Sequence, residues 1–351
     1  MDRESREMLL ETAHRFFGDK CGREVVNGVE KDQWPAELWA GIEELGLTLV
    51  AVPEEQGGVG GTLEDMLALV RVAGAHAVPV PLAETALAGM LVAGAGGSPG
   101  DGPVTLTLGA LVLKEGRLTG KVDRVPFATV ARRFVAVVDD GDTPKVVVVD
   151  AAQATVVAAQ SHAGEPYGTV RFEGAECAFV GASPVGAARA YELAALTRTL
   201  QMAGAAETVL STAVTYCQER VQFGRAISTF QAIQHLLAEL ASYVAAVIAA
   251  AEAAARDAQE GGLADGGSFS IAAAKSQASE FAHRIAAISH QCMGAMGFTH
   301  EHILHHYTRR LWVWRRDFGS ETFWGEKIGT AYAAAGPKAL WTLMTASRYA
   351  A

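Results

Sequence analysis

The sequence predicts an α+β protein of three parts: a helical N-terminal domain, a middle antiparallel β-barrel or sandwich, and a C-terminal bundle of helices. Apolar residues recur every three or four positions towards both ends of the chain, as on amphipathic helices. Between these regions lie short Val- and Thr-rich segments separated by turn residues, as in β-structure. A chain of 351 residues, half of them hydrophobic, can bury separate cores for such parts. We therefore expect domains at residues 1–102, 103–184 and 185–351.

The first domain is expected to be all helical. Leu38, Trp39, Ile42 and Leu45 mark one helical face, and proline in the first turn with glycine after the last fits that helix. A Gly-rich loop follows, and the next helix is expected to open at Thr62.

The middle domain lacks the residues that mark the starts and ends of helices. Its expected strands are rich in Val and Thr and are separated by Gly, Asp or Pro, which is typical of compact antiparallel structure. They lie at 104–108, 117–125, 134–138, 145–149, 154–158 and 169–172.

The last domain is expected to be a bundle of long helices with short connections. Two runs of small residues, 203–206 and 245–255, let helices approach closely and suit packing against another subunit. A tightly packed monomeric bundle is the alternative.

Composition excludes several function classes. The net charge of -10, without a Lys/Arg cluster, argues against a nucleic-acid partner. The charged N-terminus followed by an amphipathic helix predicts neither a signal peptide nor a membrane span. Four cysteines without a Cys-x-x-Cys pair fit a reducing compartment, so we expect a cytoplasmic protein without a structural metal: Cys21, Cys177, Cys217 and Cys292.

A loop at 220–234 interrupts two long helical runs. Gly224 breaks the helical pattern, which places Arg220 and Phe223 at a helix end. A guanidinium there can bind a pyrophosphate, and an aromatic face can contact a flat ring. An ordinary interhelical turn, with Arg220 favoured by the helix dipole, is the alternative.

The chain resembles the acyl-CoA dehydrogenase family over nearly its whole length. The loop Arg-Val-Gln-Phe-Gly-Arg-Ala-Ile from Arg220, with Phe230-Gln231 and Gln234 after it, is similar to that family's most recognisable signature. The segment Gln-Cys-Met-Gly-Ala-Met-Gly-Phe-Thr from Gln291 is similar to a second one. Two N-terminal segments, 39–61 and 79–86, also match, in the right order.

The resemblance implies an FAD-dependent enzyme with a four-helix C-terminal bundle and an acyl-CoA substrate. In such enzymes a carboxylate removes a proton α to the thioester carbonyl while a hydride passes from the β-carbon to the flavin. Two subunits share each flavin site, and the neighbour contacts the adenosine pyrophosphate. The residues that the resemblance assigns to that contact are Arg220, Phe223, Gln231, Gln291, Gly294 and Ala295, the last replacing a family glycine.

The other half of the family's site is missing. The acidic, Ser-rich loop is absent from 104–110, and Pro126 replaces a flavin-contacting threonine without offering a hydroxyl or a backbone donor. The base falls on Phe318 by one alignment and on Ala194 by another. Nearby carboxylates are the candidates Glu192 and Asp317, which can equally be solvated or helix-end charges.

The histidine-rich segment 300–306 is not expected to bind metal. His300, Glu301 and His302 are adjacent residues that point apart, and no third ligand has suitable spacing, although His305 and His306 are close.

The leading hypothesis is a subunit of an α2β2 acyl-CoA dehydrogenase, which lends the adenylate side of a flavin site to a homologous partner that carries the base. Bacterial members that this chain resembles include some that act on bulky steroid side-chain CoA thioesters. An autonomous homo-oligomeric enzyme with Glu192 or Asp317 as base is the second hypothesis. The third is a non-catalytic scaffold that has kept only the fold.

Overall fold

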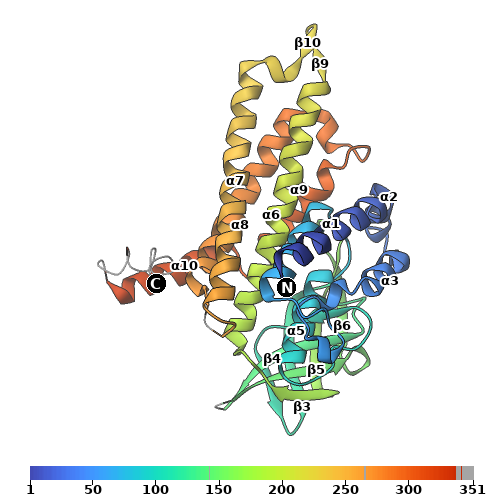
Figure 1. Cartoon of the computed structure of the whole chain (residues 1–351), viewed down its shortest axis with the longest axis vertical. Coiled ribbons are helices and arrows are strands. Elements are labelled where there is room, and N and C mark those ends of the chain that lie inside the picture. The colour runs from blue at the N-terminus through green and yellow to red at the C-terminus, as the bar shows by residue number, and fades with distance from the viewer. Residues whose placement is uncertain (142, 265, 337–340, 342–351) are drawn as a thin grey trace.

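Helices, then strands, then helices follow one another in the computed structural model, which describes residues 1–141, 143–264, 266–336 and 341. Figure 1 shows the long helices of the C-terminal part side by side, with the β-domain at one end and the N-terminal helices along the flank. The predicted fold class is confirmed. The part of the expected C-terminal bundle at 337–340 and 342–351 lies outside the described residues.

The N-terminal region folds as expected from its local signals. The side chain of Thr62 accepts a hydrogen bond from the Asp65 amide, and the Asp65 carboxylate accepts one from the Thr62 amide, so a capping box opens the helix there. Gly46 follows the preceding helix in a left-handed conformation with φ of 66°. The helices are α1 (Arg3–Lys20), α2 (Arg23–Val29), α3 (Ala36–Glu44), α4 (Leu63–Ala75) and α5 (Leu82–Gly94).

The middle region is a sandwich of two four-stranded sheets, in the orders β1-β4-β5-β8 and β2-β3-β7-β6. Phe134 of one sheet meets Phe172 of the other edge to face, 5.9 Å between ring centroids, within a shared core. The barrel alternative is wrong, because the described strands form two open sheets, and β1 runs parallel to β4. The strands are β1 (Val104–Leu106), β2 (Leu111–Lys114), β3 (Arg117–Pro126), β4 (Arg133–Asp140), β5 (Thr143–Asp150), β6 (Thr155–Gln160), β7 (Pro166–Glu176) and β8 (Phe179–Ala182).

The C-terminal bundle is built on one very long helix. Helix α6 has 33 residues, which corresponds to a length of about 50 Å. Its N-terminal end lies by the β-domain and its C-terminal end at the far tip of the molecule (Figure 1). The helices are α6 (Ala187–Glu219), α7 (Gln231–Glu260), α8 (Ser268–Met293), α9 (Leu304–Trp314) and α10 (Glu321–Ala335).

Small residues at the middle of α6 dock the N-terminal domain. A Cβ added at Gly204 would lie 2.0 Å from the Arg71 carbonyl oxygen on α4, and one at Gly74 would lie 2.1 Å from the Gln201 carbonyl oxygen. The run 203–206 is fully buried in this crossing. The expected close helix approach is therefore confirmed, but the run packs against α4 of the same chain and not against another subunit.

Helix α7 is long and apolar in composition. By length and composition alone it is apolar enough to cross a membrane, with a mean hydropathy of 1.6 over its best window, of which 22% is buried. One such helix is weak evidence for a membrane span, and α7 packs beside α6 and α8. Ala245 and Ala249 are exposed along its outer side, within the second run of small residues.

Substituting Gly204 tests the crossing of α4 and α6. Gly204→Ala is expected to lower the free energy of unfolding by about 1–3 kcal/mol, because its methyl group overlaps backbone atoms that cannot rotate away. Gly329→Ala is the matched control, since this glycine is exposed inside α10 with open space around it. There the substitution is expected to be neutral or to stabilise by up to about 1 kcal/mol in urea denaturation. Equal effects at the two positions would contradict the packing described.

Candidate cofactor and active site

The loop between α6 and α7 is a short hairpin that projects from the bundle (Figure 1). Strands β9 (Val221–Gln222) and β10 (Arg225–Ala226) pair antiparallel around Phe223 and Gly224, whose φ angles are 52° and 80°. Two positive φ angles define the tight turn that suits a two-residue hairpin. The side chain of Phe223 is 92% exposed.

Internal contacts give this hairpin a fixed shape. The Ile227 amide donates to the Arg220 carbonyl at 2.8 Å, and the Arg225 guanidinium lies over the Phe230 ring, 4.2 Å from its centroid. Arg220 is exposed, and Gln231 is exposed in the first turn of α7. The hairpin thus presents a guanidinium and an aromatic ring outside the body of its own subunit.

The second predicted segment lines a cavity of about 780 Å³ at the end of α8. Gln291 and Gly294 contribute to its wall together with Phe298 and Trp312. Gly294 adopts φ of 57° and ψ of -141°, a conformation that favours glycine, and a Cβ there would meet open space. Ala295 is exposed next to it.

The structure brings the two predicted segments to the same end of the bundle. Cys217, in the last turn of α6, contacts the Cys292 carbonyl at the end of α8, with 4.0 Å between sulfur and oxygen. Tyr216 and His302 stack edge to face with ring centroids 6.2 Å apart. All six residues predicted to contact cofactor therefore lie on this end of the bundle.

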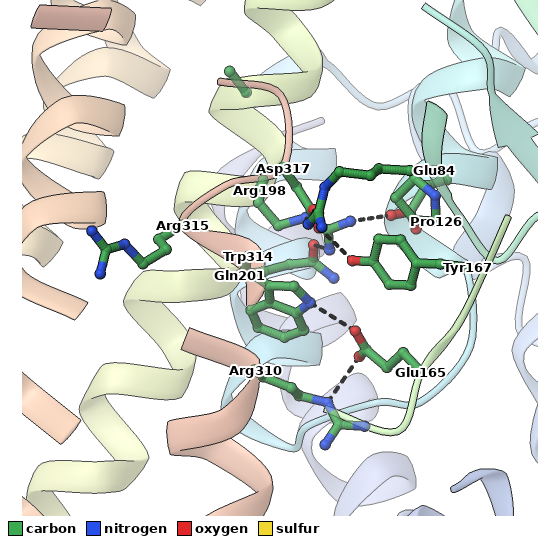
Figure 2. Close-up of polar contacts among 12 residues, drawn as sticks. Glu84, Pro126, Glu165, Tyr167, Arg198, Gln201, Arg310, Trp314, Arg315 and Asp317 are labelled. Atoms are coloured by element: carbon green, nitrogen blue, oxygen red, sulfur yellow. Dashed lines mark hydrogen bonds and ion pairs between the residues drawn. The ribbon is translucent and has the colours of Figure 1, made fainter. Parts of the chain in front are cut away.

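The opposite end of α6 carries a buried ion cluster (Figure 2). Arg198 is 1% exposed; its Nη2 donates to Glu84 Oε1 at 2.6 Å, and its Nε lies 3.4 Å from Asp317 Oδ2. Tyr167 donates its hydroxyl to Asp317 Oδ2 at 2.5 Å, and Arg124 lies 3.4 Å from Asp317 Oδ1. Both oxygens of the candidate base Asp317 are thus engaged.

The electrostatics of this cluster favour a fixed ion pair. Burial opposes the charge on Arg198, but the neighbouring carboxylates of Glu84 and Asp317 outweigh it and raise the pKa of Arg198 above its ordinary value. Burial and the Asp317 charge raise the pKa of Tyr167 well above its usual value, so the hydroxyl keeps its proton and donates a hydrogen bond to Asp317. A carboxylate held in this way is poorly suited to proton abstraction.

A third buried carboxylate, Glu165, extends the cluster towards α9 (Figure 2). Its two oxygens accept hydrogen bonds from Arg310 Nε at 2.9 Å and from Trp314 Nε1 at 3.0 Å. The Arg198 guanidinium also lies over the Trp314 ring, 5.2 Å from its centroid. The start of β7, helix α6 and helix α9 therefore pack together around the buried charges of Glu165, Arg198 and Arg310.

Phe318 occupies the position at which the resemblance would place the base. Its ring lies against Arg198, 5.7 Å from centroid to guanidinium, and meets Tyr191 edge to face. Buried Lys275 fixes this turn by donating to the carbonyls of Arg315 at 2.9 Å and Gly319 at 2.7 Å. The cavity beside Phe318 measures about 10 Å³, room for about one water molecule.

Glu192, the other candidate base, is bound in a different cluster. Its carboxylate accepts hydrogen bonds from Ser268 at 2.6 Å, Lys327 at 3.0 Å and Arg189 at 3.1 Å. Burial opposes ionisation, but these hydrogen bonds outweigh it and hold the pKa of Glu192 below its ordinary value. A general base for an α-proton needs a pKa nearer to neutrality.

Pro126, which the resemblance places at the flavin ring, is engaged with its own chain. The Pro126 carbonyl accepts the Thr105 hydroxyl at 2.7 Å, and proline has no amide to donate. Arg124 has φ of 57° at a β-bulge and turns its guanidinium towards Tyr167, 5.9 Å from the ring centroid. Pro126 therefore offers a flavin ring neither a hydroxyl nor an amide, whereas the hairpin is exposed and Gln291 lines an open cavity.

Asp317 was a candidate from the sequence, but its cluster partners Glu84 and Arg198 were not predicted. Glu84 and Arg198 each stand alone in an apolar helical run, and a charge at such a position must find a partner when it is buried. That signal was available for both residues. Their pairing was not, because the two lie 114 positions apart in sequence.

Comparisons with known proteins agree with this architecture. The model of the acyl-CoA dehydrogenase N-terminal domain matches residues 3–98, and that of the C-terminal domain matches residues 187–322. Acyl-CoA dehydrogenase IpdE2 of Mycobacterium tuberculosis is 30% identical over 315 residues, which are 88% of this chain and 91% of IpdE2. The chain belongs to the acyl-CoA dehydrogenase family. Acyl-CoA dehydrogenase FadE34 of the same organism is 34% identical over 82% of this chain, which spans only 41% of FadE34.

Solved structures of this family share the fold closely. The ChsE4-ChsE5 complex from Mycobacterium tuberculosis contains a chain with a TM-score of 0.84 and 25% identity, covering 96% of this chain and 99% of that one. The structure described as the Tcur3481-Tcur3483 steroid ACAD G363A variant gives the same TM-score at 24% identity, covering 95% and 99%. Acyl-CoA dehydrogenases are FAD-dependent oxidoreductases, so the predicted enzyme class and cofactor are confirmed.

Removing the Asp317 charge tests whether it is structural. Asp317→Asn is expected to lower the free energy of unfolding by roughly 3 kcal/mol, the low end for breaking a buried ion pair, because Glu84 stays beside Arg198. Glu173→Gln is the control, since this carboxylate on β7 is 74% exposed and is expected to change stability little. Urea denaturation measures both. A loss under about 1 kcal/mol at Asp317 would contradict this structural role.

Proposed function

We propose that this chain is the subunit of a hetero-oligomeric acyl-CoA dehydrogenase that lends the adenylate half of an FAD site to a partner subunit carrying the base. One observation carries the proposal. The base position is occupied by Phe318 beside a closed ion cluster, while the hairpin with Phe223 and the Gln291 segment are open at the other end of the bundle.

The distance between these two ends supports sites in different subunits. Glu192 lies near the start of α6 and Arg220 directly follows its end, 28 residues on. At the rise of an α-helix this separation is about 40 Å. Side chains so far apart on one rigid helix serve different sites.

In the assembled enzyme this chain binds and orients the adenylate half of FAD, and the partner performs the proton transfer. Arg220 would bind the pyrophosphate through charge-assisted hydrogen bonds, and Phe223 would pack against the cofactor. Gln291 and the backbone from Gly294 would hold the adenosine side, with Gln231 and Ala295 beside them. FAD, when bound, supplies the hydride acceptor.

The two other hypotheses fit the structure less well. An autonomous enzyme needs a base, and the partners of Glu192 and Asp317 hold both carboxylates in ion pairs. A pure scaffold gives no reason for a rigid hairpin that exposes Arg220 and Phe223, although it stays an outcome of the test below.

The partner is a homologous subunit that has kept the base and the flavin-ring pocket. The exposed Ala245 and Ala249 of α7 suit close packing of a second bundle. Both solved structures with a TM-score of 0.84 are described by two named components. An α2β2 stoichiometry and a steroid side-chain CoA substrate stay predictions from the sequence resemblance.

The pyrophosphate assignment is tested in the complex purified with its partner. Arg220→Ala is expected to weaken flavin retention about 10- to 100-fold, the effect of losing hydrogen bonds to a charged group. Arg220→Lys keeps the charge without the planar fork, so an intermediate loss is expected. Equilibrium dialysis with flavin fluorescence measures retention.

Arg171→Ala is the matched control, because Arg171 is a surface arginine of β7. Its flavin retention is expected to equal that of the wild-type complex. Unchanged retention in Arg220→Ala would contradict the proposal and favour the scaffold.

A further inference from the structure

Three side chains from distant parts of the sequence meet beside the cavity at Gln291. Glu30 follows the last residue of α2, whereas His305 and His306 lie in the first turn of α9. One potential ligand atom from each lies within 4.8 Å of the other two. No reaction step assigned above uses these residues.

His305 has a free lone pair of defined position. Its Nδ1 lies 2.7 Å from the His302 carbonyl oxygen, which can only accept, so Nδ1 carries the proton and Nε2 the lone pair. Nε2 is buried and finds no hydrogen-bond partner among the described residues. A histidine that donates one ring N–H to a backbone carbonyl is oriented as in protein metal sites.

His306 is 2% exposed, and neither ring nitrogen has a hydrogen-bond partner in the described part of the chain. Its Nδ1 lies 3.5 Å from Glu30 Oε1. Buried polar atoms without partners are rare in folded proteins and indicate an absent water or ion. Here the three unpartnered nitrogens belong to two adjacent histidines, and one of them, His306 Nδ1, faces the Glu30 carboxylate.

Glu30 is already oriented for such a role. Arg309 Nη1 donates to both of its carboxylate oxygens at 3.0 Å. Each oxygen keeps a further lone pair, and carboxylates that bind metals are themselves hydrogen-bonded by outer partners. Arg309 therefore positions the carboxylate without occupying all of its acceptor capacity.

We propose that Glu30, His305 and His306 bind a divalent transition-metal ion of the Zn²⁺ class. Two imidazoles and one carboxylate form a set that Zn²⁺ accepts, and three protein ligands leave a fourth position open. Glu30 and His305 line the cavity of about 780 Å³, so that position faces it. Zinc bonds of about 2.0–2.1 Å in tetrahedral geometry need ligand atoms about 3.3 Å apart. The three ligand atoms now lie within 4.8 Å of one another, so binding requires the side chains to close around the ion.

The ion would also join two domains. Glu30 belongs to the N-terminal domain, and both histidines belong to the bundle. An ion bound only by the folded chain raises its thermal stability by mass action. Metal binding thus has a readout that is independent of flavin and of catalysis.

The test uses the purified full chain after dialysis against a chelator. Calorimetric titration with Zn²⁺ alone is expected to show one ion per chain and a rise in Tm. His305→Gln and Glu30→Gln are each expected to weaken binding about tenfold or more. His283→Gln, which removes an exposed imidazole from α8, is expected to leave affinity unchanged.

Absence of Zn²⁺ binding, or equal affinity in the wild-type, His305→Gln and Glu30→Gln chains, would overturn the proposal. The Co²⁺ spectrum of the wild-type chain gives a second measurement that needs no variant. Intense visible bands of a four- or five-coordinate ion are expected. The weak spectrum of a six-coordinate, hydrated ion would also overturn it.

Discussion

The buried guanidinium of Arg198 is the group on which the β-domain end of this molecule depends. It joins Glu84 of α5 and Asp317 after α9, and Asp317 in turn accepts the hydroxyl of Tyr167 on β7. Elements from all three domains thus contribute to one network of ion pairs and hydrogen bonds. A buried ion pair adds little net stability against an apolar core, but losing one member leaves a costly unpaired charge. The cluster therefore fixes this end of the fold in one arrangement.

The same cluster leaves little room at the position where the sequence resemblance would place the base. A thioester pocket needs several hundred cubic ångströms, and about 10 Å³ remain beside Phe318. The end of the bundle that carries the hairpin is open instead. Phe223 lies in the tight turn with φ of 52°, and its ring is exposed to solvent. A large aromatic ring in a left-handed conformation and in water is costly, which is understandable where the ring is covered in an assembly.

Local signals made much of the fold predictable. The capping box at Thr62, the end of α6 at Arg220 and most strands of the sandwich follow from residues near them in sequence. The parallel pairing of β1 with β4 and the packing of Gly204 against α4 depend on contacts between distant segments. Spacing along one chain does not encode such contacts, so the first was missed and the second was left open between another subunit and a monomeric bundle.

The candidate site shows the same difference between features that follow from local sequence and features that need distant partners. The exposed positions of Arg220 and Gln291 agree with the motifs, whereas the engagement of Glu192 and Asp317 required partners such as Lys327 and Tyr167, far away in sequence. The contact between Glu30 and His306 also joins residues that are far apart in sequence, so local signals could not predict it.

Flavin stoichiometry tests the sharing of the site most directly. The chain should be purified alone and together with its partner, and bound flavin should be counted per polypeptide. The expected result is no stoichiometric flavin in the chain alone and one flavin for each pair of unlike chains in the complex. One flavin per chain in the isolated protein, with oxidation of an acyl-CoA, would contradict the shared site.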